Sequence, residues 1–211
     1  MRGLNIMVID AEIKEEIGKN GIGWRDFDKM GVSVACSFSF KTLEYGVYMD
    51  DNLHELTERM NDADLVVGFN HVPFDIPLLE AETRRPIRKD NHWDILEHSR
   101  RAIGWRPGPG GGKMPHGCKL DNHLAGTFGK DSLKTAHGSE APLMWKRREL
   151  GRLISYCLDD VKREARLFKY AWDHGIVKTD THGVHTLLEN PQEYFARLTN
   201  HKAHAEATAC Q

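Results

Sequence analysis

The sequence has few cysteines and lacks any long apolar segment. Its 211 residues include only four cysteines without paired spacing, which excludes a disulfide framework or a zinc ribbon. No apolar run approaches the roughly 18 residues needed to span a bilayer, and the N-terminus lacks the apolar core and cleavage site of a signal peptide. We therefore expect an intracellular protein, cytoplasmic or nucleoid-associated, that is not secreted and has no membrane partner.

Charge is distributed unevenly along the chain. The formal net charge is −2, but residues 1–83 are mainly acidic and residues 84–119 are mainly basic. A basic segment of this kind is often only a solvated face. This one also contains Trp93, Trp105 and His98, so the alternative interpretation is a surface that follows a phosphate backbone and stacks on bases.

Three β-prone segments near the N-terminus are joined by short links and predict an antiparallel meander. Residues 32–40 alternate apolar and small polar side chains, which is typical of a half-buried strand. Residues 65–69 are continuously apolar, which favours a strand buried on both faces. The predicted strands are 4–9, 32–40, 44–49, 65–69 and 92–96.

Apolar residues at three- and four-residue steps predict helices after the meander. Leu53, Leu56 and Met60 form such a stripe, with Asp51 or Asn52 as the expected N-cap. The predicted helices are 51–64, 74–83, a segment ending at Arg101, 119–127 and about 145–172, and residues 175–188 predict a final strand or hairpin.

Gly and Pro dominate residues 106–117, which predicts a loop. The order of the elements predicts an α/β fold, with a mixed β-sheet flanked by α-helices. We expect one domain over residues 1–189 and a weakly ordered tail over residues 190–211.

Carboxylates follow apolar segments at three widely separated places. Asp10 and Glu12 are two apart on a predicted strand, so both side chains point to the same face. Asp75 follows the buried strand at the start of a helix, where an ordinary N-cap is the simpler interpretation. Tyr156 and Asp160 are four apart on a helix and share a face. Carboxylates that converge in this way would repel each other unless divalent cations lay between them.

Taken together, these segments resemble the DEDD superfamily of 3′→5′ exonucleases, which includes the proofreading domains of family B DNA polymerases. The first motif of that family, Asp-x-Glu, matches "IDAE", the second, Asn-x(3)-(Phe/Tyr)-Asp, matches "NHVPFD", and the third, Tyr-x(3)-Asp, matches "YCLDD". The matching residues are Asp10, Glu12, Asn70, Phe74, Asp75, Tyr156 and Asp160.

The third motif selects the tyrosine branch of the family, DEDDy. The histidine branch has His-x(4)-Asp, which requires His at position 155, where this chain has Ser155. Two departures concern the first motif. Ile13 stands where many relatives have Thr or Ser, and residues 14–31 form a Gly-containing insertion. Both departures affect the expected substrate contacts, but neither removes a carboxylate.

The resemblance implies a ribonuclease H-like fold and a 3′→5′ exonuclease that acts on single-stranded nucleic acid, DNA in preference to RNA. It implies two divalent metal ions, Mg²⁺ or Mn²⁺, held by the four carboxylates, with Tyr156 orienting the attacking water. Asn70 and Phe74 would contact the substrate, and a polymerase or another replication or repair protein would be the partner. Two alternatives are a structure-selective ribonuclease H-like endonuclease and a catalytically idle nucleic-acid-binding module.

Overall fold

The β-prone segments of the N-terminal half form one five-stranded mixed sheet in the computed structural model, which describes residues 3–105, 116–130 and 140–199. The strand order is β3-β2-β1-β4-β5. The first three strands pair antiparallel, and β4 lies parallel to both β1 and β5. The predicted meander with added parallel strands is therefore confirmed. The strands are β1 (Ile6–Ile13), β2 (Val32–Ser39), β3 (Tyr45–Tyr48), β4 (Leu65–Gly68) and β5 (His92–Asp94).

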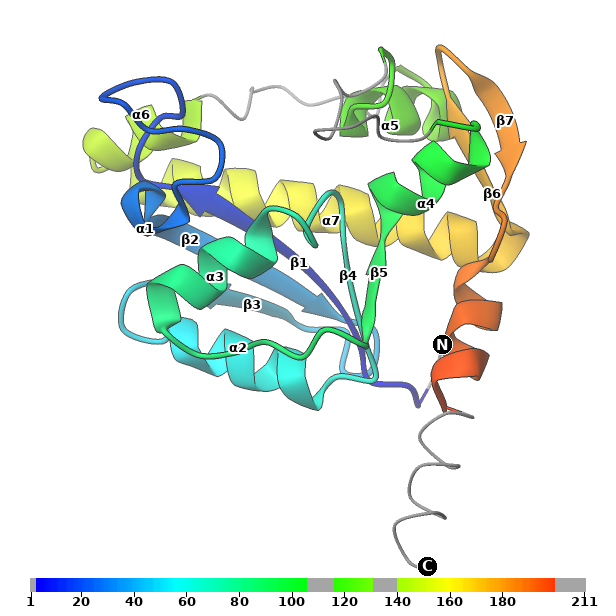
Figure 1. Cartoon of the computed structure of the whole chain (residues 1–211), viewed down its shortest axis with the longest axis horizontal. Coiled ribbons are helices and arrows are strands. Elements are labelled where there is room, and N and C mark those ends of the chain that lie inside the picture. Colours follow the sequence, from blue (N-terminus) through cyan, green and yellow to red (C-terminus); the bar gives the residue numbers. More distant parts are fainter. Residues whose placement is uncertain (1–2, 106–115, 131–139, 200–211) are drawn as a thin grey trace, which may run out of the picture. The chain divides into compact units, whose positions relative to one another are not determined.

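The chain divides into two compact units, and the sheet belongs to the first, which comprises residues 1–94 and 133–165. Figure 1 shows α2 and α3 on one side of this sheet. On that side Met7 and Ile9 of β1 pack in a buried core with Leu56 and Met60 of α2 and Leu79 of α3. Because side chains alternate along a strand, the even-numbered residues of β1 face the opposite side. The helices of the core are α1 (Phe27–Met30), α2 (Leu53–Asp62) and α3 (Asp75–Thr83).

The continuous helix predicted from Trp145 to Trp172 is wrong at its beginning. Two helices cover this region, α6 (Ala141–Lys146) and α7 (Leu150–His174). Arg148 lies between them with a φ of 60°, and this left-handed backbone ends a right-handed helix. The Glu149 N–H then donates to the carbonyl of Met144 at 2.9 Å. Neither Gly nor Pro marks this break, so the sequence pattern does not reveal it.

The second unit comprises residues 95–132 and 166–211. Its strands pair as an antiparallel hairpin, which confirms the predicted final hairpin. A Cβ atom at Gly126 would lie 2.4 Å from the backbone carbon of Thr179, so only glycine allows this helix to pack against the hairpin. The elements are α4 (Ile95–Ala102), α5 (Leu120–Phe128), β6 (Ile176–Thr179) and β7 (Gly183–Thr186).

Two predicted irregular segments extend beyond the described residues. Most of the predicted loop at 106–117 lies outside them. The sequence predicts a weakly ordered tail after Asn190, whereas residues 191–199 are helical and residues 200–211 lie outside the description. No helix in the described ranges has both the length and the apolar character to cross a membrane.

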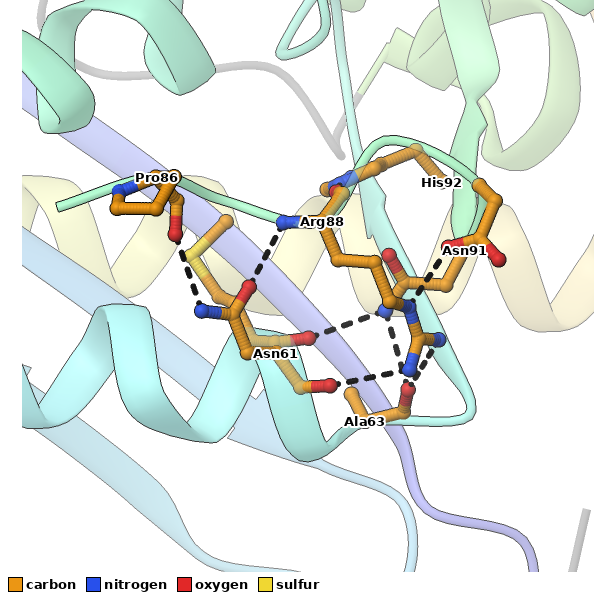
Figure 2. A network of polar contacts seen from close by, with 8 residues as sticks. Asn61, Ala63, Pro86, Arg88, Asn91 and His92 are labelled. Carbon is orange, nitrogen blue, oxygen red and sulfur yellow. Dashed lines mark hydrogen bonds and ion pairs between the residues drawn. The ribbon is translucent and has the colours of Figure 1, made fainter.

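Side chains from a loop satisfy the C-terminal carbonyl groups of α2 (Figure 2). The Arg88 guanidinium donates to the carbonyls of Asn61 at 3.0 Å and Ala63 at 2.8 Å. The Asn91 side-chain amide donates to the carbonyls of Met60 and Ala63, each at 3.0 Å. The last carbonyls of a helix have no partner within it, so these two side chains complete the hydrogen bonding and join α2 to the loop that leads into β5.

Replacing Arg88 with alanine should destabilise the first unit by about 2 kcal/mol, because hydrogen bonds from a charged donor to two partly buried carbonyls are lost. Urea unfolding measures this change. Arg88→Lys should restore only part of the loss, since a single ammonium group does not reproduce the planar fork that reaches both carbonyls. Equal stability of the Lys variant and the wild type would contradict this explanation.

Candidate active site

Asp10 and Glu12 lie in the part of β1 that extends beyond β4. The parallel pairing of β1 with β4 covers only Ile6–Val8, whereas the antiparallel pairing with β2 continues to Ile13. On the side toward β4, the free edge of β1 therefore offers backbone groups to other partners. The thiol of Cys157 on α7 lies 3.6 Å from the Asp10 carboxylate, which places Asp10 on the face of the sheet that α7 covers.

Asp75 occupies this free edge of β1. It is the first residue of α3, one position beyond the N-cap, which is Phe74. Its carboxylate accepts the Ala11 N–H at 2.9 Å, and its side chain is buried. Burial raises the pKa of Asp75 well above its ordinary value, and the nearby Asp10 carboxylate raises it further. The carboxylate thus joins β1 to the start of α3.

The carboxylates of Asp10, Glu12 and Asp160 form a cluster. Each offers an oxygen, and these three oxygens lie within 4.8 Å of one another. In the described part of the chain this is the one such group of metal-ligating side chains, and it does not include Asp75. The cluster thus combines side chains of two predicted segments, β1 and α7, and Asp75 of the third segment lies beside it, near Asp10.

Tyr156 lies one helical turn before Asp160 on α7 and is buried. Burial raises the pKa of its hydroxyl above the usual range, and the carboxylates of Asp160, Glu12 and Asp10 add to this effect. The hydroxyl also makes a hydrogen bond with the Asp160 side chain. Arg163, one turn further along, lies 3.5 Å from the Asp160 carboxylate. No sequence motif marks this arginine, which offsets part of the negative charge.

The cluster fits a hard divalent cation. Magnesium and manganese prefer carboxylate oxygen ligands, and oxygens from three carboxylates are already grouped here. The Asp10 and Glu12 side chains are only partly buried, so solvent reaches the group. A cation would also relieve the repulsion among these charges. RNase H-like nucleases generally use divalent metals, and this donor set is consistent with that chemistry.

An open cavity of about 400 Å³ adjoins the cluster, with Glu12 and Phe74 in its lining. The insertion that follows β1 supplies Ile17 and Trp24 to the same cavity. Trp24 is 53% exposed, and its ring centroid lies 4.9 Å from that of Phe74. The sequence indicates the insertion but does not assign a role to this tryptophan. The signal that could have identified it is an aromatic residue in a Gly-containing segment just after the first motif.

Two of the three aromatic residues of the basic segment, Trp93 and His98, are not available for base stacking. Trp93 is fully buried in β5, where it pairs with Val67 of β4, and His98 is buried as well. The predicted base-stacking role of these two side chains is therefore wrong. A strand that is buried on both faces needs large apolar side chains, and Trp93 meets this requirement although its neighbours in the sequence, His92 and Asp94, are polar.

Asn70 lies in the turn between β4 and α3 with a φ of 66°. This left-handed conformation is uncommon for residues other than glycine, and asparagine is enriched in it. The Asn70 N–H donates to the Asp94 carboxylate at 3.0 Å. Asparagine at position 70 therefore suits the left-handed backbone of this turn, in addition to any contact of its side-chain amide.

Comparisons with known proteins agree with this architecture. Residues 29–172 match the RNase H superfamily. The matched segment contains Asp75, Tyr156 and Asp160 and begins after Asp10 and Glu12. A search of curated proteins finds no match.

Among solved structures, the chain is similar to the family B DNA polymerase from the hyperthermophilic archaeon Pyrobaculum calidifontis, with 17% sequence identity and a TM-score of 0.54. The similarity covers 79% of this chain and 24% of the polymerase chain, so the chain spans about a quarter of the polymerase's length. A likeness at this identity is one of fold. Because the superfamily match covers more than half of the chain and the mixed sheet with flanking helices is ribonuclease H-like, the chain belongs to the RNase H superfamily.

Proposed function

We propose that this protein is a metal-dependent 3′→5′ exonuclease that hydrolyses terminal phosphodiester bonds of single-stranded nucleic acid, with DNA favoured over RNA. One observation carries the proposal: the three-carboxylate cluster lies beside Tyr156 and opens to a cavity with aromatic walls. Membership of the RNase H superfamily supports hydrolysis of nucleic acid. The order and spacing of the three motifs support the exonuclease assignment.

Asp10, Glu12 and Asp160 would hold divalent cations, with Asp75 as the fourth carboxylate, and the proposed complement is two Mg²⁺ or Mn²⁺ ions. When bound there, the cations would favour deprotonation of the attacking water and neutralise charge that develops on the phosphate and the leaving oxygen. The protein's contribution is to hold the carboxylates on three rigid elements, a strand and two helices, before substrate arrives.

Tyr156 is the proposed residue that orients the attacking water. Because burial raises the pKa of its hydroxyl, the group stays protonated at neutral pH and does not act as a general base. Its proton is donated to Asp160, so the hydroxyl oxygen would accept a hydrogen bond from the water. The hydrogen bond to Asp160 holds the hydroxyl next to that carboxylate. A tyrosine in this place positions a water molecule without taking its proton.

The cavity would receive the terminal nucleotide. Phe74 and Trp24 line this cavity together with Glu12, and base stacking on aromatic rings is tolerant of sequence. A strand end with unpaired bases can enter a surface of this kind, which supports the preference for single strands. Asn70 is the further proposed substrate contact. The fold likeness to a polymerase supports a polymerase, or another replication or repair protein, as the proposed partner.

Cleavage of 5′-labelled oligonucleotides tests the proposal. Single- and double-stranded DNA and RNA are incubated with Mg²⁺ or Mn²⁺ and with wild type, Asp75→Ala or the exposed control Asp51→Ala. We expect a ladder that shortens from the 3′ end of single-stranded DNA, a loss of about 10²-fold or more in the Asp75 variant, and wild-type activity in the control. A single internal cut would favour the endonuclease, and no cleavage together with no Mn²⁺-induced rise in melting temperature would favour the idle module.

A further inference from the structure

A buried carboxylate holds the turn between β4 and α3. Asp94 is the last residue of β5, and its side chain is 2% exposed. One carboxylate oxygen, Oδ1, accepts the Asn70 N–H at 3.0 Å, and the other, Oδ2, accepts the Val72 N–H at 3.1 Å. The parallel strands β4 and β5 place Asp94 directly opposite Gly68, just before this turn. The carboxylate therefore binds the turn from the neighbouring strand.

The turn has the form of an anion-binding nest. The left-handed φ of 66° at Asn70 lets N–H groups close together in the sequence point into one concavity, and such concavities bind anions. In this chain the anion is the protein's own Asp94. Since the carboxylate is buried, these N–H donors stabilise its negative charge. The carboxylate in turn stabilises the conformation of the turn.

His71, which lies between Asn70 and Val72 in the sequence, links the turn to a second histidine. His71 is fully buried, with Nδ1 3.6 Å from the Asp94 carboxylate and Nε2 3.1 Å from Nδ1 of His92. His92 in turn contacts the carbonyl of Arg88 through its other ring nitrogen, Nε2, at 2.5 Å. Burial lowers the pKa of His71 to about 3 and that of His92 to about 4, so both rings are neutral at pH 7. This chain connects the turn to the loop that caps α2.

The same turn sets the start of α3. The carbonyl of His71 accepts the Ile76 N–H at 2.9 Å, and the carbonyl of Phe74 accepts the Leu78 N–H at 3.1 Å. The first turn of the helix is thus bonded to the nest, and Asp75 lies in that first turn, bonded to β1 through the Ala11 N–H. A change in the nest would move Asp75 relative to β1.

We propose that Asp94 is a positioning residue for the proposed exonuclease: its carboxylate fixes the turn at residues 70–72 and thereby places the Asp75 carboxylate beside the Asp10, Glu12 and Asp160 cluster. This inference rests on the proposed function, because it gives the placement of Asp75 a catalytic meaning. Asp94 itself does not touch the reacting atoms. Its effect should therefore appear in metal binding and turnover rather than in affinity for the nucleic acid.

Asp94→Asn tests the proposal, because asparagine keeps the volume but offers an amide NH₂ to one of the two N–H donors. Removal of a group that orients a metal ligand typically costs about 10- to 100-fold in metal affinity or activity. We expect the Mn²⁺ concentration for half-maximal stabilisation to rise about tenfold and kcat to fall about 10- to 100-fold, with KM for the oligonucleotide changed less than about twofold. An unchanged Mn²⁺ midpoint and kcat would overturn the proposal.

Asp64→Asn is the matched control. The Asp64 carboxylate also accepts a backbone N–H, that of Asn5 at 2.9 Å, but it precedes β4 and so lies at the end of the parallel strands away from the cluster. We expect this variant to lower the melting temperature and leave the Mn²⁺ midpoint unchanged. If both variants shift the Mn²⁺ midpoint equally, general destabilisation accounts for the effect and the proposal fails.

A pair of substitutions at Asn70 keeps the test valid if Asp94→Asn fails to fold. Asn70→Gly and Asn70→Ala both remove the amide, but only glycine keeps the left-handed backbone without strain. The alanine variant should therefore lose more Mn²⁺ affinity than the glycine variant, and equal losses would overturn the proposal. Mn²⁺ binding is measured without nucleic acid, so the two proposals can fail separately. A wild type that binds Mn²⁺ but cleaves no nucleic acid would reject the proposed function. The Mn²⁺ midpoints of the Asp94 and Asp64 variants would still test whether Asp94 positions Asp75.

Discussion

Asp10→Asn should lose nuclease activity by about 10³-fold, which corresponds to about 4 kcal/mol of transition-state stabilisation supplied through a metal ligand. The same variant should be more stable than the wild type when metal is removed with EDTA. Asp10, Glu12 and Asp160 offer oxygens within 4.8 Å of one another, and Asp10 also raises the pKa of the buried Asp75. Loss of one charge from this group should raise the free energy of unfolding by about 1 kcal/mol.

Addition of Mn²⁺ should reverse this order of stability. A ligand that binds only the folded protein at about 100 times its Kd stabilises that protein by about 2.7 kcal/mol. The wild type should gain this stabilisation, and Asp10→Asn should gain little. Melting temperatures in EDTA and in a Mn²⁺ titration measure the effect, with the exposed Asp51→Asn as the control for removing a carboxylate. A wild type that is already the more stable protein in EDTA would contradict the repulsion argument.

Local periodicity accounts for the parts of the fold that the sequence predicts well. The stripe of Leu53, Leu56 and Met60 in α2 matches the buried residues. The half-buried strand predicted from the alternation at residues 32–40 is wrong, because β2 is buried on both faces from Val32 to Ser37. The family resemblance predicts that Asp10, Glu12, Asp75 and Asp160 converge, and the structure groups oxygens of Asp10, Glu12 and Asp160. Strand and helix geometry alone shows only that Asp10 and Glu12 share a face and that Tyr156 and Asp160 share a face. The chemical roles of these residues stay predictions.

The remaining features depend on tertiary contacts that leave no local pattern. Arg148 ends a helix in a left-handed conformation without Gly or Pro, and Trp93 is buried although its neighbours in the sequence are polar. Trp24 reaches the cavity because the insertion folds back over Phe74. Asp94 binds a turn 24 residues earlier in the chain. Such placements depend on the order of the strands in the sheet. A single sequence does not show this order until the fold is known.

The stability of the protein should fall as the pH drops from 7 to 5, because His71 and His92 are buried in their neutral forms. Burial lowers their pKa values to about 3 and about 4, from 6.5. In the unfolded chain both imidazoles protonate as the pH falls below 6.5, whereas in the folded protein they stay neutral. Their contribution is complete above pH 6.5 and is lost as the pH falls toward 4. At pH 5 the loss is about 2 kcal/mol for each histidine.

Asp75 acts in the opposite direction in the same pH range. Its raised pKa means that the folded protein binds a proton at this carboxyl before the unfolded chain does, so this group makes the protein more stable as the pH falls.

Urea unfolding at pH 7 and pH 5 in an Asp75→Asn background isolates the histidine contribution. In that background, replacing both His71 and His92 with Gln should remove about 4 kcal/mol of the difference between the two pH values. The exposed His54→Gln is the control for removing an imidazole. If the double variant kept the full pH dependence, the burial of neutral imidazoles would not be its cause.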